Sequence, residues 1–313
     1  MTWGQGKIWY DGKLVDWADA TCHVLSHALH YGSSVFEGIR CYEVQGRPCV
    51  LRLKDHVRRL FDSSKIYRME IPYAPEDIER AIRETIRANG LKSCYVRPLV
   101  FRGLQVLGLN PLPCPVRCVI AVWSWGRYLG EESAEAGVSV SVSSWRRPAP
   151  DTFPTLAKAG GNYLNSQLMK IEALRIGVDE AIALDTAGFV SEGSGENIFV
   201  VRDGIVRTPP SSSSILPGIT RDCVLRLAEA QGVPVREEAI PREALYVADE
   251  IFFSGTAAEI VPIARVDGLP VGSGRRGPIT EKIQAAYMDL LSGAAPDAYG
   301  WLDPVDGDGG ASA

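Results

Sequence analysis

The sequence contains no apolar run that approaches the ~18–20 residues a membrane-spanning helix requires. Residues 1–4 lead directly into a strand-like pattern, without the apolar core of a signal peptide, so we expect a cytoplasmic protein with no membrane partner. Its 33 Lys and Arg residues are scattered and are outnumbered by 38 Asp and Glu, which gives a net charge of −5. Because a polyanion needs a clustered basic surface, nucleic acid is excluded as an expected partner.

Cysteine and histidine are too sparse for a disulfide framework or a metal centre. The seven cysteines are odd in number, contain no CxxC pair and lie mostly in apolar stretches, which is typical of reduced thiols. His23, His27 and His30 would share one face of a helix, but the stretch from His23 to Gly32 contains no Asp, Glu or Cys to complete a ligand set. We therefore expect no bound metal.

The length of 313 residues, with 46% hydrophobic and 23% charged residues, is typical of a globular protein of two domains. Residues 1–125 alternate between strand and helix patterns and form the predicted smaller N-terminal α/β domain. Its expected strands are 7–17, a hairpin around Asp11-Gly12, then 38–44, 48–53, 93–101 and 116–125, and its expected helices are 54–67 and 75–88. The polar, glycine-bounded stretch 126–137 predicts the interdomain loop.

Residues 138–313 form the predicted larger C-terminal domain, again with mixed strands and helices, so the expected fold class is α/β (α+β). Its expected strands are 138–144, 180–184, 197–201, 205–208 and 250–254, and its expected helices are 162–176, 219–231 and 279–291. The tail from Ser292 is rich in Gly, Ala, Asp and Pro, and we expect it to fray beyond Pro304.

Four stretches of the second half could carry chemistry. Lys158 lies among small, apolar neighbours, and Glu192 lies in a glycine-containing turn. Pro217-Gly218 leads into a helix whose free N–H groups would form an anion site, and Gly255-Thr256 leaves a strand with small residues that let a ligand approach the backbone. An amine, a carboxylate and two phosphate-binding turns together are what pyridoxal 5'-phosphate requires.

These stretches also carry a resemblance to a known family. SHALHYGSSVFEGIRCY, YVRPL, AKAGGNYL, SEGSGENIF, LPGITRD and SGTAAEI occur in this order, and the likeness extends from the first strand to GWLDPV. The chain resembles the class IV pyridoxal-phosphate-dependent aminotransferases (fold type IV), and within them the branched-chain amino acid aminotransferases of bacterial type. The resemblance implies a two-domain enzyme with the cofactor bound at the domain interface and the Schiff-base lysine in the larger domain.

The resemblance also implies how the cofactor is held. Lys158 corresponds to the Schiff-base lysine, Tyr163 to the tyrosine on the ring hydroxyl, and Glu192 to the acid on the pyridinium nitrogen. Arg59, three residues after His56, matches the phosphate-binding arginine better than Arg58 does. The remaining cofactor-binding residues implied by the family are Leu216, Ile219, Thr220 and Thr256.

The implied reaction transfers the amino group of L-leucine, L-isoleucine or L-valine to 2-oxoglutarate, so amino acids and 2-oxo acids are the expected partners. Tyr95 and Arg97 alternate on one strand and should point to one face. The resemblance places Arg97 on the distal carboxylate of glutamate, with Tyr31 contributed across the interface of a homodimer, which could assemble further into a hexamer (trimer of dimers). The other implied substrate-binding residues are Phe36, Trp125, Ala257 and Ala258.

Three alternatives stay open. A D-amino acid aminotransferase or an aminodeoxychorismate lyase of the same fold would use the same lysine and glutamate, although the Tyr95-Val96-Arg97 strand disfavours both. A non-catalytic anion- or nucleotide-binding protein would use the glycine-rich turns alone. Leu107 and Leu109 depart from the Met and Val that the family's pocket loop often carries, so the preferred order among the three branched-chain substrates is open.

Overall fold

The computed structural model describes residues 4–126, 129–130 and 132–306. Contacts divide the chain into two compact units: the first comprises Met1–Trp125, Ala157–Gly161 and Leu290–Ala313, and the second comprises Gly126–Leu156 and Asn162–Asp289. The division after Trp125 lies where the sequence pattern placed it. The expected assignment of Lys158 and the C-terminal residues to the larger second domain is different in the structure, because Ala159 forms a β-bridge with Val35 and the last strand joins the first unit's sheet.

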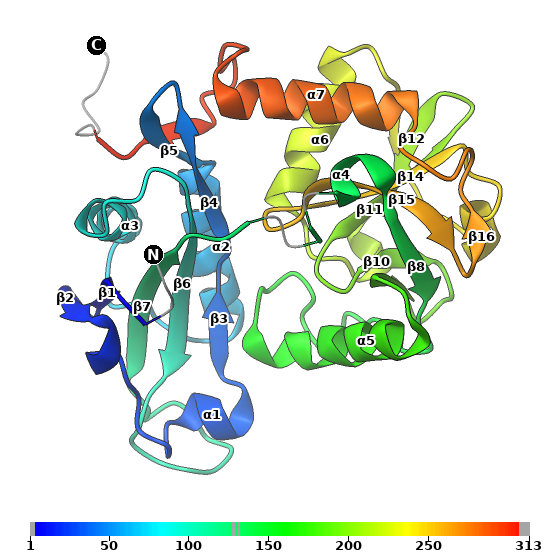
Figure 1. Cartoon of the computed structure of the whole chain (residues 1–313). Helices are drawn as coiled ribbons and strands as arrows, with labels where there is room; N and C mark the ends of the chain where they lie inside the picture. Colours follow the sequence, from blue (N-terminus) through cyan, green and yellow to red (C-terminus); the bar gives the residue numbers. More distant parts are fainter. Residues whose placement is uncertain (1–3, 127–128, 131, 307–313) are drawn as a thin grey trace. The chain divides into compact units, whose positions relative to one another are not determined.

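The first unit is an antiparallel sheet with helices packed on it (Figure 1). The strand order is β17-β5-β4-β6-β7-β1-β2, and β3 pairs with β6. The strands are β1 (Lys7–Tyr10), β2 (Lys13–Asp16), β3 (Ser34–Phe36), β4 (Ile39–Val44), β5 (Arg47–Leu51), β6 (Cys94–Arg102), β7 (Val116–Trp123) and β17 (Leu302–Pro304). The helices are α1 (His27–Tyr31), α2 (Leu53–Ile66) and α3 (Pro75–Ala88), with a 3-10 turn η1 (Trp17–Asp19).

Helical periodicity explains how α2 and α3 cover the sheet. Ile78, Ile82 and Ile86 recur every four residues on α3 and are at most 1% exposed, so one face of the helix is apolar and buried. Pro75 occupies the first turn, where no intrahelical hydrogen bond is lost. Both predicted helices and the predicted hairpin are confirmed.

The second unit is built around a nine-stranded mixed sheet. The strands are β8 (Val138–Val142), β9 (Glu180–Leu184), β10 (Val190–Gly193), β11 (Asn197–Arg202), β12 (Ile205–Thr208), β13 (Val235–Glu237), β14 (Glu250–Gly255), β15 (Glu259–Val266) and β16 (Leu269–Pro270). The helices are α4 (Ser133–Ala136), α5 (Tyr163–Ile176), α6 (Ile219–Ala230) and α7 (Pro278–Ser292), with 3-10 turns η2 (Gly160–Asn162), η3 (Ser211–Ser213) and η4 (Arg242–Leu245). The first two residues of η2 and the last three of α7 belong to the first unit.

The strand order β10-β9-β8-β15-β14-β11 closes on itself, because β10 also pairs with β11. The closing pair sets Glu192 directly opposite Asn197. Glu192 therefore lies on a strand, whereas the glycines around it had indicated a turn between strands. The structure also contains β10 and β15, which were not predicted, and the helix α4 inside the expected interdomain loop.

Two further expectations concern the C-terminal tail and membrane-spanning helices. Most of the tail expected to fray, residues 307–313, lies outside the described residues. Among the residues that are described, no helix has both the length and the apolar character that crossing a bilayer requires.

Candidate active site

Lys158 has a fixed backbone in the first unit. Its N–H donates to Ser63 Oγ at 3.0 Å, and its carbonyl accepts from Phe36 N at 3.0 Å. Gly160 is needed beside it, since a Cβ there would lie 2.4 Å from Ser34 Oγ. The side chain is partly buried, with Nζ 5.0 Å from the centre of the Phe36 ring. The main chain that carries this lysine is therefore held in one defined position.

A buried network that sequence reasoning missed holds Arg59. Glu37, which is fully buried, accepts from Arg59 Nε at 2.6 Å and Nη2 at 2.9 Å, and from His56 Nδ1 at 2.7 Å. This two-point contact fixes the plane of the guanidinium. The neighbouring Arg58 is 75% exposed and pairs with Asp55, so the geometry separates the two arginines that the sequence left nearly equivalent.

The charges of this network are settled by burial and by one another. Burial would raise the pKa of Glu37, but Arg59 and His56 outweigh it and hold that pKa well below its usual range. Burial lowers the pKa of His56, with Arg59 and Lys158 adding to the effect and Glu37 opposing it. The shifts thus favour an anionic carboxylate at Glu37 and the neutral form of the His56 imidazole.

Arg97 lies among aromatic rings instead of acids. Its guanidinium carbon lies 4.8 Å from the centre of the Phe36 ring, 5.3 Å from that of Tyr95 and 5.9 Å from that of Trp123. Nη2 donates to Tyr95 Oη at 3.3 Å, which confirms that the two residues share one face of β6. Nε is buried without a hydrogen-bond partner in the part of the chain that is described, so it could bind a carboxylate. Trp123 was not predicted.

Tyr95 is held in place by two further neighbours. Trp125 packs edge-on against its ring, with centroids 4.7 Å apart. Gly38 leaves room for its hydroxyl, since a Cβ at that position would lie 1.9 Å from Tyr95 Oη. The structure thus brings four predicted residues of the first unit together: Phe36, Tyr95, Arg97 and Trp125.

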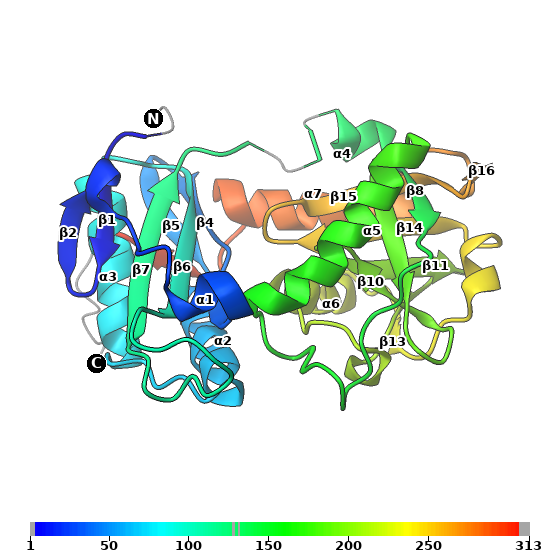
Figure 2. The same cartoon turned by 90° about the horizontal axis from the view of Figure 1, so that it is seen from below.

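Tyr31 is the last residue of α1 and is 45% exposed. It is not one of the residues that surround Arg97 and Tyr95. Figure 2 shows α1 beside the loop that joins β6 to β7, and His27 Nε2 contacts Gly108 O of that loop at 2.9 Å. His27 Nδ1 contacts Ser33 Oγ at 2.7 Å, so this histidine tethers the loop. No group of three His, Cys, Asp or Glu side chains that could hold a metal occurs within the described residues.

In the second unit, Glu192 is buried and held by donors on both carboxylate oxygens. Oε1 lies 3.1 Å from Arg147 Nη2, and Oε2 accepts from Leu216 N at 3.0 Å and from Asn197 Nδ2 at 3.2 Å. Asn197 also donates to Leu216 O at 2.9 Å. Three charged or amide donors therefore stabilise the ionised carboxylate. Arg147 and Asn197 were not predicted, because their sequence surroundings resemble ordinary loop and strand.

The start of α6 offers an anion site. Its first N–H groups, at Ile219 and Thr220, have no intrahelical acceptor. Thr220 Oγ1 lies 3.5 Å from Thr256 Oγ1, so a hydroxyl from each of two elements faces the same place. Gly218 is required before the helix, since a Cβ there would lie 2.0 Å from Asn197 Oδ1. These groups fit a phosphate.

The other predicted residues of the second unit lie in the β14–β15 turn and at the start of α5. Ala257 and Ala258 follow Thr256 in the turn between β14 and β15, and small side chains there leave the backbone accessible to a ligand. Tyr163 is the first residue of α5 and is partly buried. The first unit offers a lysine on a fixed backbone, and the second offers a buried carboxylate with three donors and a helix start that fits a phosphate. Taken unit by unit, the residues present fit the parts of pyridoxal 5'-phosphate.

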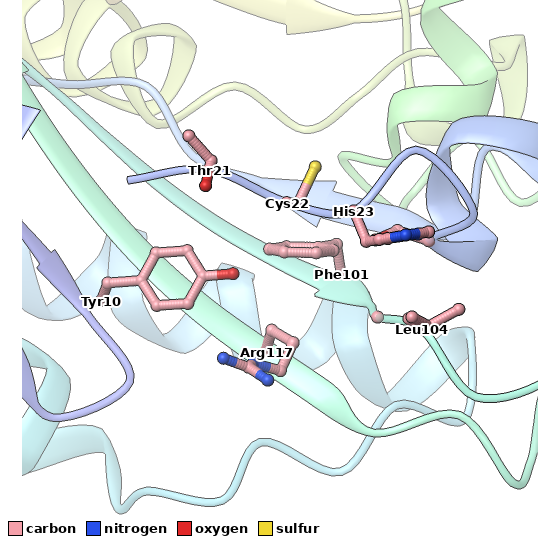
Figure 3. Close-up of a pocket in the computed structure, with 9 residues that line it drawn as sticks. Tyr10, Thr21, Cys22, His23, Phe101, Leu104 and Arg117 are labelled. Atoms are coloured by element: carbon pink, nitrogen blue, oxygen red, sulfur yellow. The ribbon is translucent and has the colours of Figure 1, made fainter. Parts of the chain in front are cut away.

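A cavity of about 320 Å³ lies elsewhere in the first unit (Figure 3). Arg117 there pairs with Asp11 and stacks on Tyr10, 5.3 Å from the ring centre. The other residues that line this cavity are Thr21, Cys22, His23, Ser26, Phe101, Gly103 and Leu104. None of the predicted site residues lines it, so we do not place the chemistry there.

Comparison with known proteins agrees with this chemistry. The family model described as amino-transferase class IV matches residues 34–266. Branched-chain-amino-acid aminotransferases of Salmonella typhimurium and Escherichia coli K12 are 53% identical over 300 residues, which cover 96% of this chain and 97% of theirs. The solved structure of the Escherichia coli branched-chain amino acid aminotransferase superposes with a TM-score of 0.95 at 52% identity, covering 96% of this chain and all of that one.

A second solved structure contains the cofactor. The branched-chain amino acid aminotransferase of Thermobaculum terrenum in its PLP form, the holo form, has a TM-score of 0.88 at 34% identity, and the match covers 96% of this chain and 99% of that one. The mixed helix-and-sheet fold of this chain is therefore the fold of these enzymes.

Proposed function

On the premise that this chain belongs to the class IV aminotransferase family, we propose that Lys158, Glu192 and the start of α6 are its working parts. The protein is a pyridoxal-phosphate-dependent transaminase of branched-chain amino acids. It transfers the amino group of L-leucine, L-isoleucine or L-valine to 2-oxoglutarate reversibly, giving the branched 2-oxo acid and L-glutamate. When bound, pyridoxal phosphate forms imines with amines and accepts the electrons released at the substrate's α-carbon.

Lys158 is the proposed catalytic residue. The observation that carries this assignment is its fixed backbone, held by Ser63 and Phe36 in a surround of small residues. Its Nζ would attach the cofactor and, once displaced by the substrate amine, would accept the α-proton and deliver it to the cofactor's C4' carbon. A base that moves a proton between two carbons must be delivered from a fixed point, and the two backbone hydrogen bonds fix the main chain from which the Lys158 side chain extends.

The other cofactor contacts follow from charge and position. Glu192, which accepts from Arg147, Asn197 and Leu216, would pair with the protonated ring nitrogen, and Tyr163 would donate to the ring oxygen. The N–H groups of Ile219 and Thr220, the hydroxyl of Thr256 and the guanidinium of Arg59 would bind the phosphate. Leu216 would contact the cofactor while its N–H supports Glu192.

The substrate contacts must serve an aliphatic side chain and a carboxylate in turn. Arg97 would bind the distal carboxylate of glutamate, and Tyr95, with the turn at Ala257 and Ala258, would hold the α-carboxylate. Aromatic rings stabilise the positive charge of Arg97. The pocket can therefore hold an aliphatic substrate, which has no carboxylate to pair with Arg97. Phe36, Trp125, Tyr163 and Tyr31 would form the apolar wall.

We also propose a homodimer as the minimal unit, with a trimer of dimers as its larger form. Support comes from apolar residues exposed on α1 and on the β6–β7 loop, which His27 joins into one surface. Leu29 is 61% exposed and Leu109 90%. Large apolar side chains exposed on two neighbouring elements are consistent with an interface there. The free cysteines are consistent with a reducing compartment, so we propose a cytoplasmic location.

The function is tested by substituting Lys158. Lys158→Ala and Lys158→Arg should lose the visible absorbance of the bound cofactor and at least ~10³-fold of the leucine-to-2-oxoglutarate transamination rate. Lys65→Ala, at an exposed position on α2, is the matched control and should change neither. Unchanged absorbance and turnover in Lys158→Ala would contradict the assignment. Turnover of D-alanine but not L-leucine by the wild-type protein would contradict the substrate class.

A further inference from the structure

Arg147 is a buried arginine on the segment that follows β8, and its contacts point to a role at Glu192. It is 6% exposed. Nη2 lies 3.1 Å from Glu192 Oε1, and Nη1 donates to Asn165 Oδ1 at 3.0 Å. Its backbone N–H donates to Leu184 O at 2.9 Å. Both ends of this residue are therefore anchored, so the guanidinium has one defined position against the carboxylate.

Asn165 extends that anchoring to α5. Its side-chain amide donates to Arg146 O at 3.0 Å while its carbonyl accepts from Arg147. Asn165 lies two residues after Tyr163 on the same helix. Arg147 thus connects Glu192 to the first turn of the helix that carries Tyr163, and two of the proposed ring contacts share one rigid support.

We infer that Arg147 is a positioning residue whose guanidinium keeps the proton shared by Glu192 and the cofactor's pyridine nitrogen on the nitrogen. This inference rests on the proposed function, in which Glu192 faces that nitrogen. A fixed cation on Oε1 stabilises the ionised carboxylate and makes it a weaker competitor for the proton. No atom beyond that one proton changes place.

Removing the guanidinium would shift this proton from the ring nitrogen towards Glu192. Asn197 and Leu216 would still donate to Oε2, but a buried carboxylate that has lost a charged partner is stabilised less and takes up a proton more readily. The nearby cation Lys170 cannot take the place of the guanidinium, because it is already paired to Glu180 at 2.8 Å. The ring nitrogen would then be neutral and a weaker electron acceptor.

The experiment is a pH titration of the visible absorbance of the cofactor-loaded enzyme. A neutral ring withdraws fewer electrons, so Lys158 Nζ, once joined to the cofactor's C4' carbon, should hold its proton more tightly. Arg147→Met should therefore move the titration midpoint upward by about one pH unit. Its kcat for leucine should fall about tenfold or more, with little change in the KM for leucine.

Two matched variants separate charge from packing. Arg147→Lys keeps the cation and should titrate close to wild type. Asn165→Ala frees the guanidinium without removing it and should move the midpoint in the same direction as Arg147→Met, but by less. The melting temperatures of the cofactor-free proteins report any general loss of folding.

The outcomes are distinguishable. A midpoint and kcat for Arg147→Met equal to those of wild type would overturn the inference, as would equal shifts in Arg147→Lys and Arg147→Met. If Arg147→Met does not fold, an unshifted midpoint in Asn165→Ala overturns it. Failure of the proposed function would appear separately, as cofactor absorbance that survives Lys158→Ala.

Discussion

Glu196 shows how a single buried acid can govern the protein's response to pH. It is 4% exposed, and its Oε2 accepts from Gly195 N at 3.1 Å. Burial, helped by the charges of Glu180 and Glu192 and opposed by Gly195 and Lys170, raises its pKa to about 8. In the folded protein it is therefore protonated at neutral pH, whereas in the unfolded chain it ionises near pH 4.5.

The linkage has a definite sign. Between about pH 4.5 and 8 the folded state holds one more proton than the unfolded state, so this residue's contribution to stability falls as pH rises and is fully lost above about 8. Glu196→Gln keeps an acceptor for Gly195 and removes the titration. We expect the melting temperature of Glu196→Gln, relative to that of wild type at the same pH, to rise as pH increases from 5 to 9.

Thermal melts across that range test the prediction, with the exposed Glu229→Gln as the control that should follow wild type. A constant difference between Glu196→Gln and wild type from pH 5 to 9 would show that Glu196 does not titrate with folding. Such a residue could not be identified from its motif, since SEGSGENIF contains two glutamates and only the three-dimensional surroundings distinguish their ionisation.

At the scale of elements, the start of α6 depends on one glycine. Gly218 has an ordinary backbone φ of −73°, so its requirement is spatial. An added Cβ would lie 2.0 Å from Asn197 Oδ1, and Asn197 in turn donates to Glu192 and to Leu216. Gly218→Ala should therefore disturb the phosphate site and the carboxylate together.

We expect Gly218→Ala to cost about 1–3 kcal/mol of folding free energy, the range for overpacking, and to weaken cofactor binding at least tenfold. Urea denaturation and cofactor titration measure the two effects. A double-mutant cycle with Asn197→Ala identifies the cause, because that background removes the 2.0 Å contact and leaves only Arg221 Cβ at 3.2 Å, so the added methyl should cost less. Full additivity of the two substitutions would rule out the clash.

The elements differ in how well sequence predicts them. α2, α3, α5 and α6 carry apolar spacing or start and stop signals over 12 to 14 residues, and all four were predicted within a few residues. β10 has only four residues and contains glycine, so its local signal is that of a turn, and only pairing with β9 and β11 makes it a strand. Arg147 and Glu37 act through partners distant in sequence, which no local pattern specifies.

At the scale of the whole molecule, the proposed dimer explains why apolar side chains are exposed on α1 and the β6–β7 loop. Leu109 is 90% exposed and so contributes nothing to the packing of its own chain. A charge placed there should leave the monomer folded but would be buried without a partner in a dimer, at a cost that dissociates it. Leu109→Glu is therefore a selective probe.

Light scattering after size-exclusion chromatography should give wild type at twice the chain mass of 34.0 kDa, or at six times that mass if the dimers assemble into trimers. Leu109→Glu should elute as a single chain and, because Tyr31 would no longer reach a partner's site, should lose most of its transaminase activity. Leu269→Glu, 53% exposed on β16, is the control and should keep both mass and activity. A Leu109→Glu protein that stays dimeric and active would place the interface elsewhere, and Tyr31 would then have to serve its own chain.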